Sequence, residues 1–157
     1  MAVQQNSYSE NIGKGRPGMV ATMNAWDADT KICETAAGIG FGLAVGRGSD
    51  DKGAILGAGA AAGFLGVSIR DVTLESSQSD KYAQYQNMAV LKKGVIWVTA
   101  GGNVQDGQDV TFNSSTGVLS SIAADGSNFT IPGARWVDTV SSGDLARIEL
   151  TGQMTGA

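Results

Sequence analysis

Residues 88–110, MAVLKKGVIWVTAGGNVQDGQDV, place short apolar runs between glycine-containing turns. The runs are too short for helices, and their valine, isoleucine and tryptophan side chains favour the pleated, half-buried environment of a β-strand. The segment contains no plausible catalytic group. It therefore predicts a β-scaffold and a contact surface.

The same pattern extends outward in both directions, in a chain whose 157 residues include 23 glycines. We expect strands at residues 19–25, 31–36, 39–45, 64–74, 89–91, 95–99, 109–112, 118–121, 134–140 and 145–150. Short strands at regular spacing with glycine turns are typical of sandwiches and barrels, and the length suits one domain. The prediction is an all-β, single-domain β-sandwich or small jelly-roll-like barrel.

Residues 1–18 differ from the rest of the chain, because they are polar and contain Gly13, Gly15, Pro17 and Gly18. Such a segment forms no stable local helix. We expect an extended N-terminal arm at residues 1–18 and a β-rich domain at 19–157, with a disordered tail as the alternative for the arm. The segment lacks the basic start and apolar core of a signal peptide, which predicts folding in a cytoplasm.

The composition excludes several classes of function. Histidine is absent and Cys33 is the single cysteine, so no Ser-His or Cys-His nucleophile pair and no intramolecular disulfide can form. The net charge of −4 opposes binding to nucleic acid, since phosphate neutralisation needs clustered basic residues. No apolar segment is long enough for a membrane span. We therefore expect no enzyme, no nucleic-acid partner and no membrane partner.

The glycine-rich and acidic motifs of the chain are too incomplete to hold a cofactor or metal. The GxGxxxG string at residues 57–63 lacks the strand and helix that a dinucleotide site needs around it. The acid pairs Asp27 with Asp29 and Asp50 with Asp51 are interpreted as exposed turns, because no loop carries a complete ligand series. Lys92 and Lys93 are likewise interpreted as a solvated turn. No cofactor or metal is expected.

Candidate interface residues come from two parts of the chain. Arginine and tryptophan are enriched at protein interfaces, which singles out Arg135, Trp136 and Arg147 as anchors. An extended arm can add a strand to the edge of a neighbour's sheet. The candidates in the arm are Lys14, Arg16 and Pro17.

The three tryptophans, Trp26, Trp97 and Trp136, have two interpretations. They form a platform for a carbohydrate or partner, or they fill the core, which we favour in a chain with few aromatic residues.

Several short strings occur in order along the chain: residues 17–20 (PGMV), 39–45 (IGFGLAV), 64–67 (FLGV), 93–98 (KGVIWV), 104–110 (VQDGQDV), 133–136 (GARW) and 142–150 (SGDLARIEL). Taken together in this order, they resemble the head decoration, or structural cement, proteins of tailed bacteriophages. The series spans residues 13–150, and the Ala- and Gly-rich run at 54–63 departs from it.

This resemblance implies a non-enzymatic cement protein on the outer surface of the virion, made in the host cytoplasm. Its partners would be the major capsid protein, whose neighbouring subunits it bridges, and further copies of itself. A trimer is expected, with a dimer as the alternative. The other functions left open are a tail or fibre domain of a virion and a glycan-binding β-module.

Overall fold

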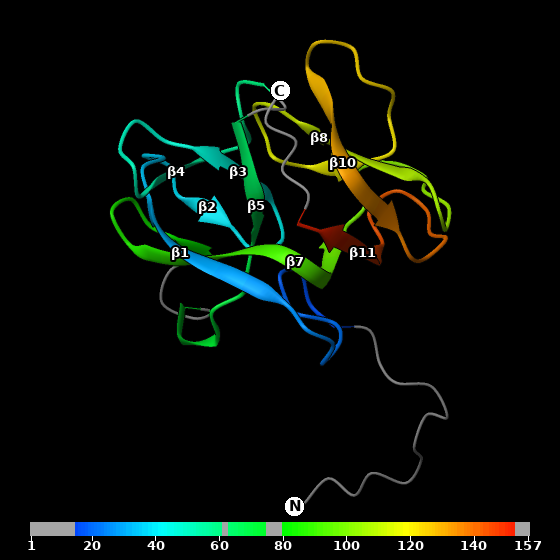
Figure 1. Ribbon diagram of the computed structural model, residues 1–157, viewed down its shortest axis with the longest axis horizontal. Helices are drawn as coiled ribbons and strands as arrows, with labels where there is room; N and C mark the ends of the chain where they lie inside the picture. Colours follow the sequence, from blue (N-terminus) through cyan, green and yellow to red (C-terminus); the bar gives the residue numbers. More distant parts are fainter. Residues whose placement is uncertain (1–14, 61–62, 75–79, 153–157) are drawn as a thin grey trace, which may run out of the picture.

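The computed structural model of the protein describes residues 15–60, 63–74 and 80–152 (Figure 1). The first strands are β1 (Asp27–Cys33), β2 (Ile39–Gly40), β3 (Ala44–Arg47), β4 (Gly53–Leu56), β5 (Phe64–Ser68) and β6 (Lys81–Tyr82). They are followed by β7 (Asn87–Thr99), β8 (Asp109–Asn113), β9 (Leu119–Ser120), β10 (Asn128–Trp136) and β11 (Leu145–Thr151). A short 3₁₀ helix, η2 (Val72–Leu74), precedes β6. The all-β prediction is confirmed.

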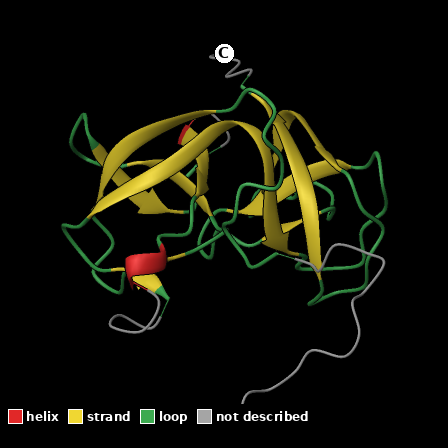
Figure 2. Cartoon of the chain, turned by 90° about the horizontal axis from the view of Figure 1, so that it is seen from below, coloured by secondary structure: helices red, strands yellow, loops and turns green. Residues whose placement is uncertain are grey.

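The described strands form one large sheet that partly closes on itself. Its order is β1-β4-β3-β5-β7-β11-β10-β8-β9, and β1 also pairs with β7. This additional pairing closes β1, β4, β3, β5 and β7 into a small barrel, which is one of the two architectures that the sequence predicted. Strands β11, β10, β8 and β9 continue the sheet beyond β7 and form the second half of the molecule (Figure 2).

Strand β7 belongs to both halves and supplies side chains to both cores. Met88 and Val90 pack in the barrel core with Cys33, Val45 and other residues of the barrel strands. Leu91, Ile96 and Val98 pack in the larger cluster, which includes Phe112, Trp136 and Ile148 of the second half. Because alternate side chains of a strand point to opposite faces, one strand can be buried on both sides.

Gly94 lets β7 run unbroken through both halves. The sequence predicted two strands, at 89–91 and 95–99, separated by a turn at Lys92 and Lys93. That turn prediction was wrong, because both lysines lie within β7. Gly94 takes a φ of 130°, which only glycine adopts without strain, and a Cβ at this position would collide with the Cβ of Trp26.

Other local predictions also differ from the structure. Asp27 and Asp29, expected in a turn, belong to β1 and pair with β7. The strand expected at 64–74 ends at Ser68, and the 3₁₀ helix η2 occupies Val72–Leu74. The strand expected at 19–25 reduces to one bridge, from Val20 to Ile96.

Glu34 holds the turn between β3 and β4 against the end of β1. Its carboxylate accepts hydrogen bonds from the backbone N–H groups of Ser49 (2.8 Å) and Asp50 (3.0 Å) and from the Ser49 hydroxyl (2.8 Å). These donors favour the charged form, so they hold the pKa of Glu34 below its ordinary value.

A lowered pKa in the folded state predicts a loss of stability in acid. The contribution of Glu34 is complete above the ordinary glutamate pKa of about 4.3 and is lost as the pH falls through the lower folded pKa. Replacing Glu34 by Gln should lower the melting temperature at pH 6 and flatten the fall in stability between pH 5 and pH 3. Thermal unfolding across this range measures the effect. Glu149→Gln controls for the lost charge, and an unchanged pH profile in Glu34→Gln would contradict the assignment.

Candidate interaction surfaces

Residues 18–21 form a short edge segment on β7, at the start of the described chain. Gly18 N–H donates to the carbonyl of Trp97 (2.8 Å), and Ala21 N–H donates to that of Val95 (2.7 Å). Trp97 N–H donates back to the carbonyl of Met19 (2.9 Å). The segment therefore continues, beyond Gly94, the edge of β7 that β1 occupies before it.

Arg70 fastens this segment to the barrel. Its Nε donates to the Pro17 carbonyl (2.8 Å), its backbone N–H donates to the Gly18 carbonyl (2.8 Å), and its guanidinium lies over the Phe41 ring. The side chain of Arg70 is only 7% exposed. Gly18 has a positive φ of 84° and lies too close to Arg70 and Phe41 for a Cβ. Two of the predicted interface residues, Arg16 and Pro17, are positioned by this fastening.

Replacing Arg70 by Met should release the segment without emptying the site, because Met keeps the apolar stem and removes the guanidinium donors. We expect faster hydrogen exchange at the amides of Gly18 and Ala21 and a lower melting temperature. Exchange at the amide of Ile148, in the second half, serves as the internal reference. Unchanged protection of Gly18 and Ala21 would contradict a fastening role for Arg70.

Residues 22–26 leave the sheet and carry exposed apolar side chains. They lie between the segment paired with β7 at Val20 and the start of β1 at Asp27. Met23 is fully exposed, Trp26 is 51% exposed, and Met19 just before them is 43% exposed. Methionine and tryptophan are enriched in protein interfaces, and neighbouring exposed apolar residues mark contact sites. We call residues 19–26 the apolar segment.

Arg147, another predicted interface residue, lies beside this region. Arg147 and Trp97 are directly opposed on β11 and β7, and the guanidinium lies 5.5 Å from the centre of the Trp97 ring. Asp138 accepts two hydrogen bonds from the guanidinium, at 2.9 and 2.6 Å. This carboxylate raises the pKa of Arg147. Arg147 is thus held over Trp97, next to the edge where residues 18–21 are bound.

Arg135 lies on the same outer face of the sheet but is paired within the chain. Its neighbours across the ladder are Glu149 on β11 and Asp109 on β8. The guanidinium forms an ion pair with Asp109, and Glu149, directly opposite Arg135 in the ladder, projects from the same face of the sheet. A row of alternating charges such as this one stabilises a sheet face modestly.

Trp136, the remaining predicted interface residue of the β-rich domain, is buried within the chain. Trp136 is 1% exposed, lies in the larger core cluster, and its Nε1–H donates to the Ser120 carbonyl (3.1 Å). Successive side chains of β10 point to opposite faces of the sheet, so Trp136 points into the core while its neighbour Arg135 points outward. Lys14 lies outside the described residues.

The three tryptophans do not share one environment, although the sequence favoured the core for all of them. Trp136 fills the core as expected, Trp97 is half-buried, and Trp26 is an exposed member of the apolar segment. The exposure of Trp26 could have been predicted from its neighbours. The methionines before it and the two aspartates after it do not show the alternation of apolar and polar residues that marks a half-buried strand. The three rings do not form one platform.

The described residues contain no cluster of three or more potential metal-binding side chains. Among their helices, none has the length and apolar character required to cross a membrane.

Comparison with known proteins gives the family. A family model described as structural cement protein (E217 gp24/Pam3 gp6) matches residues 3–151. A solved structure titled "The capsid of Myoviridae Phage XM1" contains a similar chain, with a TM-score of 0.72 and 13% sequence identity over 94% of this chain and 96% of that one. No curated protein matches the sequence.

The family match covers nearly the whole chain. The class of this protein is therefore that of structural proteins. The chain belongs to the phage structural cement protein family, and this membership gives it a structural role in a phage capsid. The resemblance found in the ordered sequence strings is confirmed. The likeness to the XM1 capsid chain supports the same fold.

Proposed function

We propose that the protein attaches to the outer surface of an assembled phage head and bridges neighbouring major capsid protein subunits, thereby stabilising the shell. The observation that carries this proposal is the apolar segment. Met19, Met23 and Trp26 project from a backbone that is fixed to β7 on one side and continues into β1 on the other. A rigid mounting reduces the entropy lost when such side chains are buried by a partner.

Charged groups beside the apolar segment orient the protein on the surface of its partner. Arg16 is exposed three residues before the apolar segment, and Arg147 is fixed over Trp97 by Asp138. An apolar centre with a charged margin is the usual anatomy of a protein interface. This arrangement favours attachment to a protein surface over binding of a glycan.

Bridging stabilises a shell by mass action, because a protein that binds only the assembled lattice shifts the equilibrium towards it. Several modest contacts held on one oligomer raise the total affinity by a factor of roughly 10² to 10⁴. We accordingly propose that the protein acts as an oligomer, a trimer in the first instance and a dimer as the alternative. Lys14 and the rest of residues 1–18 are proposed to contact the shell or a sister subunit.

The first test is attachment of the Met23→Ser/Trp26→Ser double variant to expanded, undecorated phage heads. The wild type should co-sediment saturably at a fixed ratio per capsomer. Each truncated apolar anchor is expected to cost about 1–2 kcal/mol, so the variant should bind more than about tenfold more weakly.

Ile122→Ser is the matched control, because Ile122 is as exposed as Trp26 but lies on the loop after β9. It should attach like the wild type. Circular dichroism and thermal unfolding establish that the variants are folded. Equal attachment of the double variant would contradict the role of the apolar segment, and absence of wild-type attachment would shift the proposal to a tail or fibre component or a glycan-binding module.

A further inference from the structure

The open end of the small barrel carries charged side chains on its inner face. On β1, Asp29 and Lys31 lie directly opposite Val90 and Met88 of β7, both of which are in the barrel core. Directly opposed residues of paired strands project from the same face, so Asp29 and Lys31 also point inward. At this end of the barrel, the inward-pointing positions therefore carry charged side chains instead of apolar ones.

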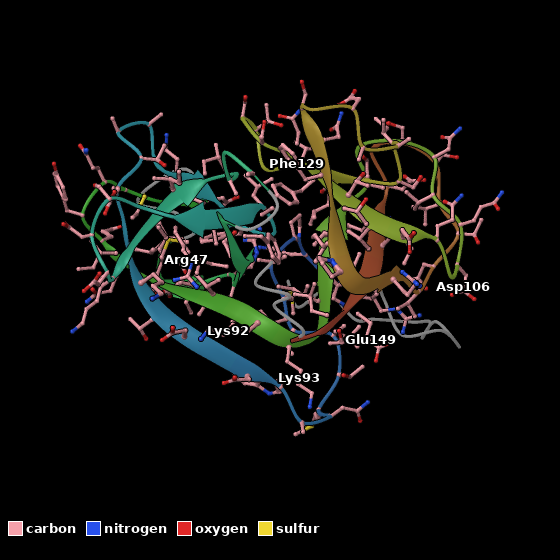
Figure 3. The ribbon with its side chains drawn as sticks, turned by 45° about the horizontal axis from the view of Figure 1, so that its top comes forward. Arg47, Lys92, Lys93, Asp106, Phe129 and Glu149 are labelled. Atoms are coloured by element: carbon pink, nitrogen blue, oxygen red, sulfur yellow. The ribbon has the colours of Figure 1, made fainter. Side chains whose placement is uncertain are left out.

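The neighbouring strands repeat the change. On β7, Lys92 follows the core residue Val90 at a spacing of two, and on β3, Arg47 follows the core residue Val45 in the same way. Residues two apart in a strand share a face. Arg47 and Lys92 lie at one end of the barrel (Figure 3).

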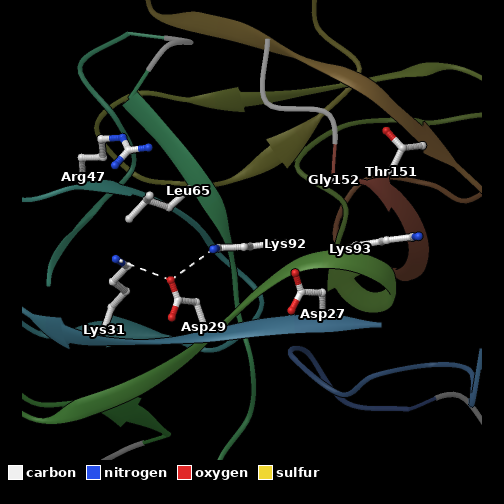
Figure 4. A pocket seen from close by; sticks show the side chains of 9 residues that line it. All are labelled: Asp27, Asp29, Lys31, Arg47, Leu65, Lys92, Lys93, Thr151 and Gly152. Atoms are coloured by element: carbon white, nitrogen blue, oxygen red, sulfur yellow. Dashed lines mark ion pairs between the residues drawn. The ribbon is translucent and has the colours of Figure 1, made fainter. Parts of the chain in front are cut away.

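These side chains line a pocket of about 390 Å³ (Figure 4). Its charged members are Lys31, Arg47, Lys92 and Lys93 on the basic side and Asp27 and Asp29 on the acidic side. The pocket thus has two more cationic than anionic side chains, in a chain whose net charge is −4. Ligand sites occur preferentially at such places, including the mouths of β-barrels.

Asp29 already neutralises part of the basic charge. Its carboxylate lies 3.1 Å from the Lys92 ammonium and 3.6 Å from that of Lys31. The hydrogen bond from Lys92 contributes most to holding the pKa of Asp29 below its ordinary value. Lys31, with a side chain 14% exposed, also donates to the Asp51 carbonyl (3.3 Å).

Arg47 and Lys93 have no corresponding partner. Among the residues that the structure describes, neither forms an ion pair, and Figure 4 draws none for them. An arginine guanidinium donates two parallel hydrogen bonds to a carboxylate. Arg47 is exposed at the mouth, so its guanidinium is open to a carboxylate presented from outside the barrel.

We propose that the barrel mouth binds a carboxylate side chain presented by an acidic loop of the capsid shell, with Arg47 as its principal partner. This inference rests on the proposed attachment to the shell and names the chemistry of a second contact. A carboxylate with one negative charge fits better than a phosphate group with a higher charge, since Asp27 and Asp29 line the pocket and Asp50 and Asp51 line the adjoining hollow. These four carboxylates repel the more highly charged group more strongly.

The direct test titrates the protein with blocked tetraglutamate peptide, and separately with inorganic phosphate, at constant ionic strength. Nuclear magnetic resonance follows the Arg47 Nε–H group and the amides of Lys31 and Lys92. Tetraglutamate should give saturable shifts in the wild type, and binding should weaken about tenfold in Arg47→Gln, the effect of losing one charge-assisted hydrogen-bonded pair. Lys52→Gln is the matched control, because Lys52 is exposed in the adjacent turn and lines neither hollow.

Three results would overturn the proposal: no saturable shift with tetraglutamate, equal binding by Arg47→Gln, or tighter binding of phosphate than of the peptide. The last result would assign the mouth to a free anion.

Attachment of the same variants to phage heads separates this proposal from the proposed function. Arg47→Gln should attach about tenfold more weakly than the wild type and Lys52→Gln equally well. If both variants attach like the wild type, carboxylate docking fails while the attachment stands. If the wild type binds tetraglutamate but no head, the site stands as a carboxylate site and its assignment to the shell fails.

Discussion

The structure depends on the pairing of β7 along both of its edges. This strand receives β1 and β5 in its first part and β11 along its second part, while residues 18–21 bind its remaining edge. Backbone groups buried without partners are costly, and continuous pairing satisfies them over the length of the strand. The same strand closes the barrel and supports the second half, so the two cores cannot form independently of it.

The functional surfaces follow from this arrangement. Where the edge partner of β7 changes from β1 to residues 18–21, the intervening chain leaves the sheet and exposes Met23 and Trp26. Where the barrel strands end, their inward positions carry Lys31 and Arg47. One surface is apolar and the other is basic, so the two proposed contacts call for different chemistry in a partner.

The sequence predicted the strands well where one local pattern decided the outcome. The alternation at residues 145–150 and the apolar run at 95–99 both correspond to strands, and Trp136 occupies the core. Prediction failed where distant pairing decides. Barrel closure requires β1 to pair with β7, and no local sequence pattern in residues 27–33 predicts this pairing. The basic mouth was missed because its cations come from three strands, and Lys92 with Lys93 resembles a turn when the pairing is unknown.

The most direct test of the central claim is a cryo-electron microscopy structure of heads decorated with the wild-type protein. The account predicts that residues 19–26 and the barrel mouth both face the shell, with Met23 buried by the major capsid protein and an acidic side chain within hydrogen-bonding distance of Arg47. A structure in which Met23 and Arg47 face solvent, while the outer row of Arg135, Glu149 and Asp109 meets the shell, would contradict it.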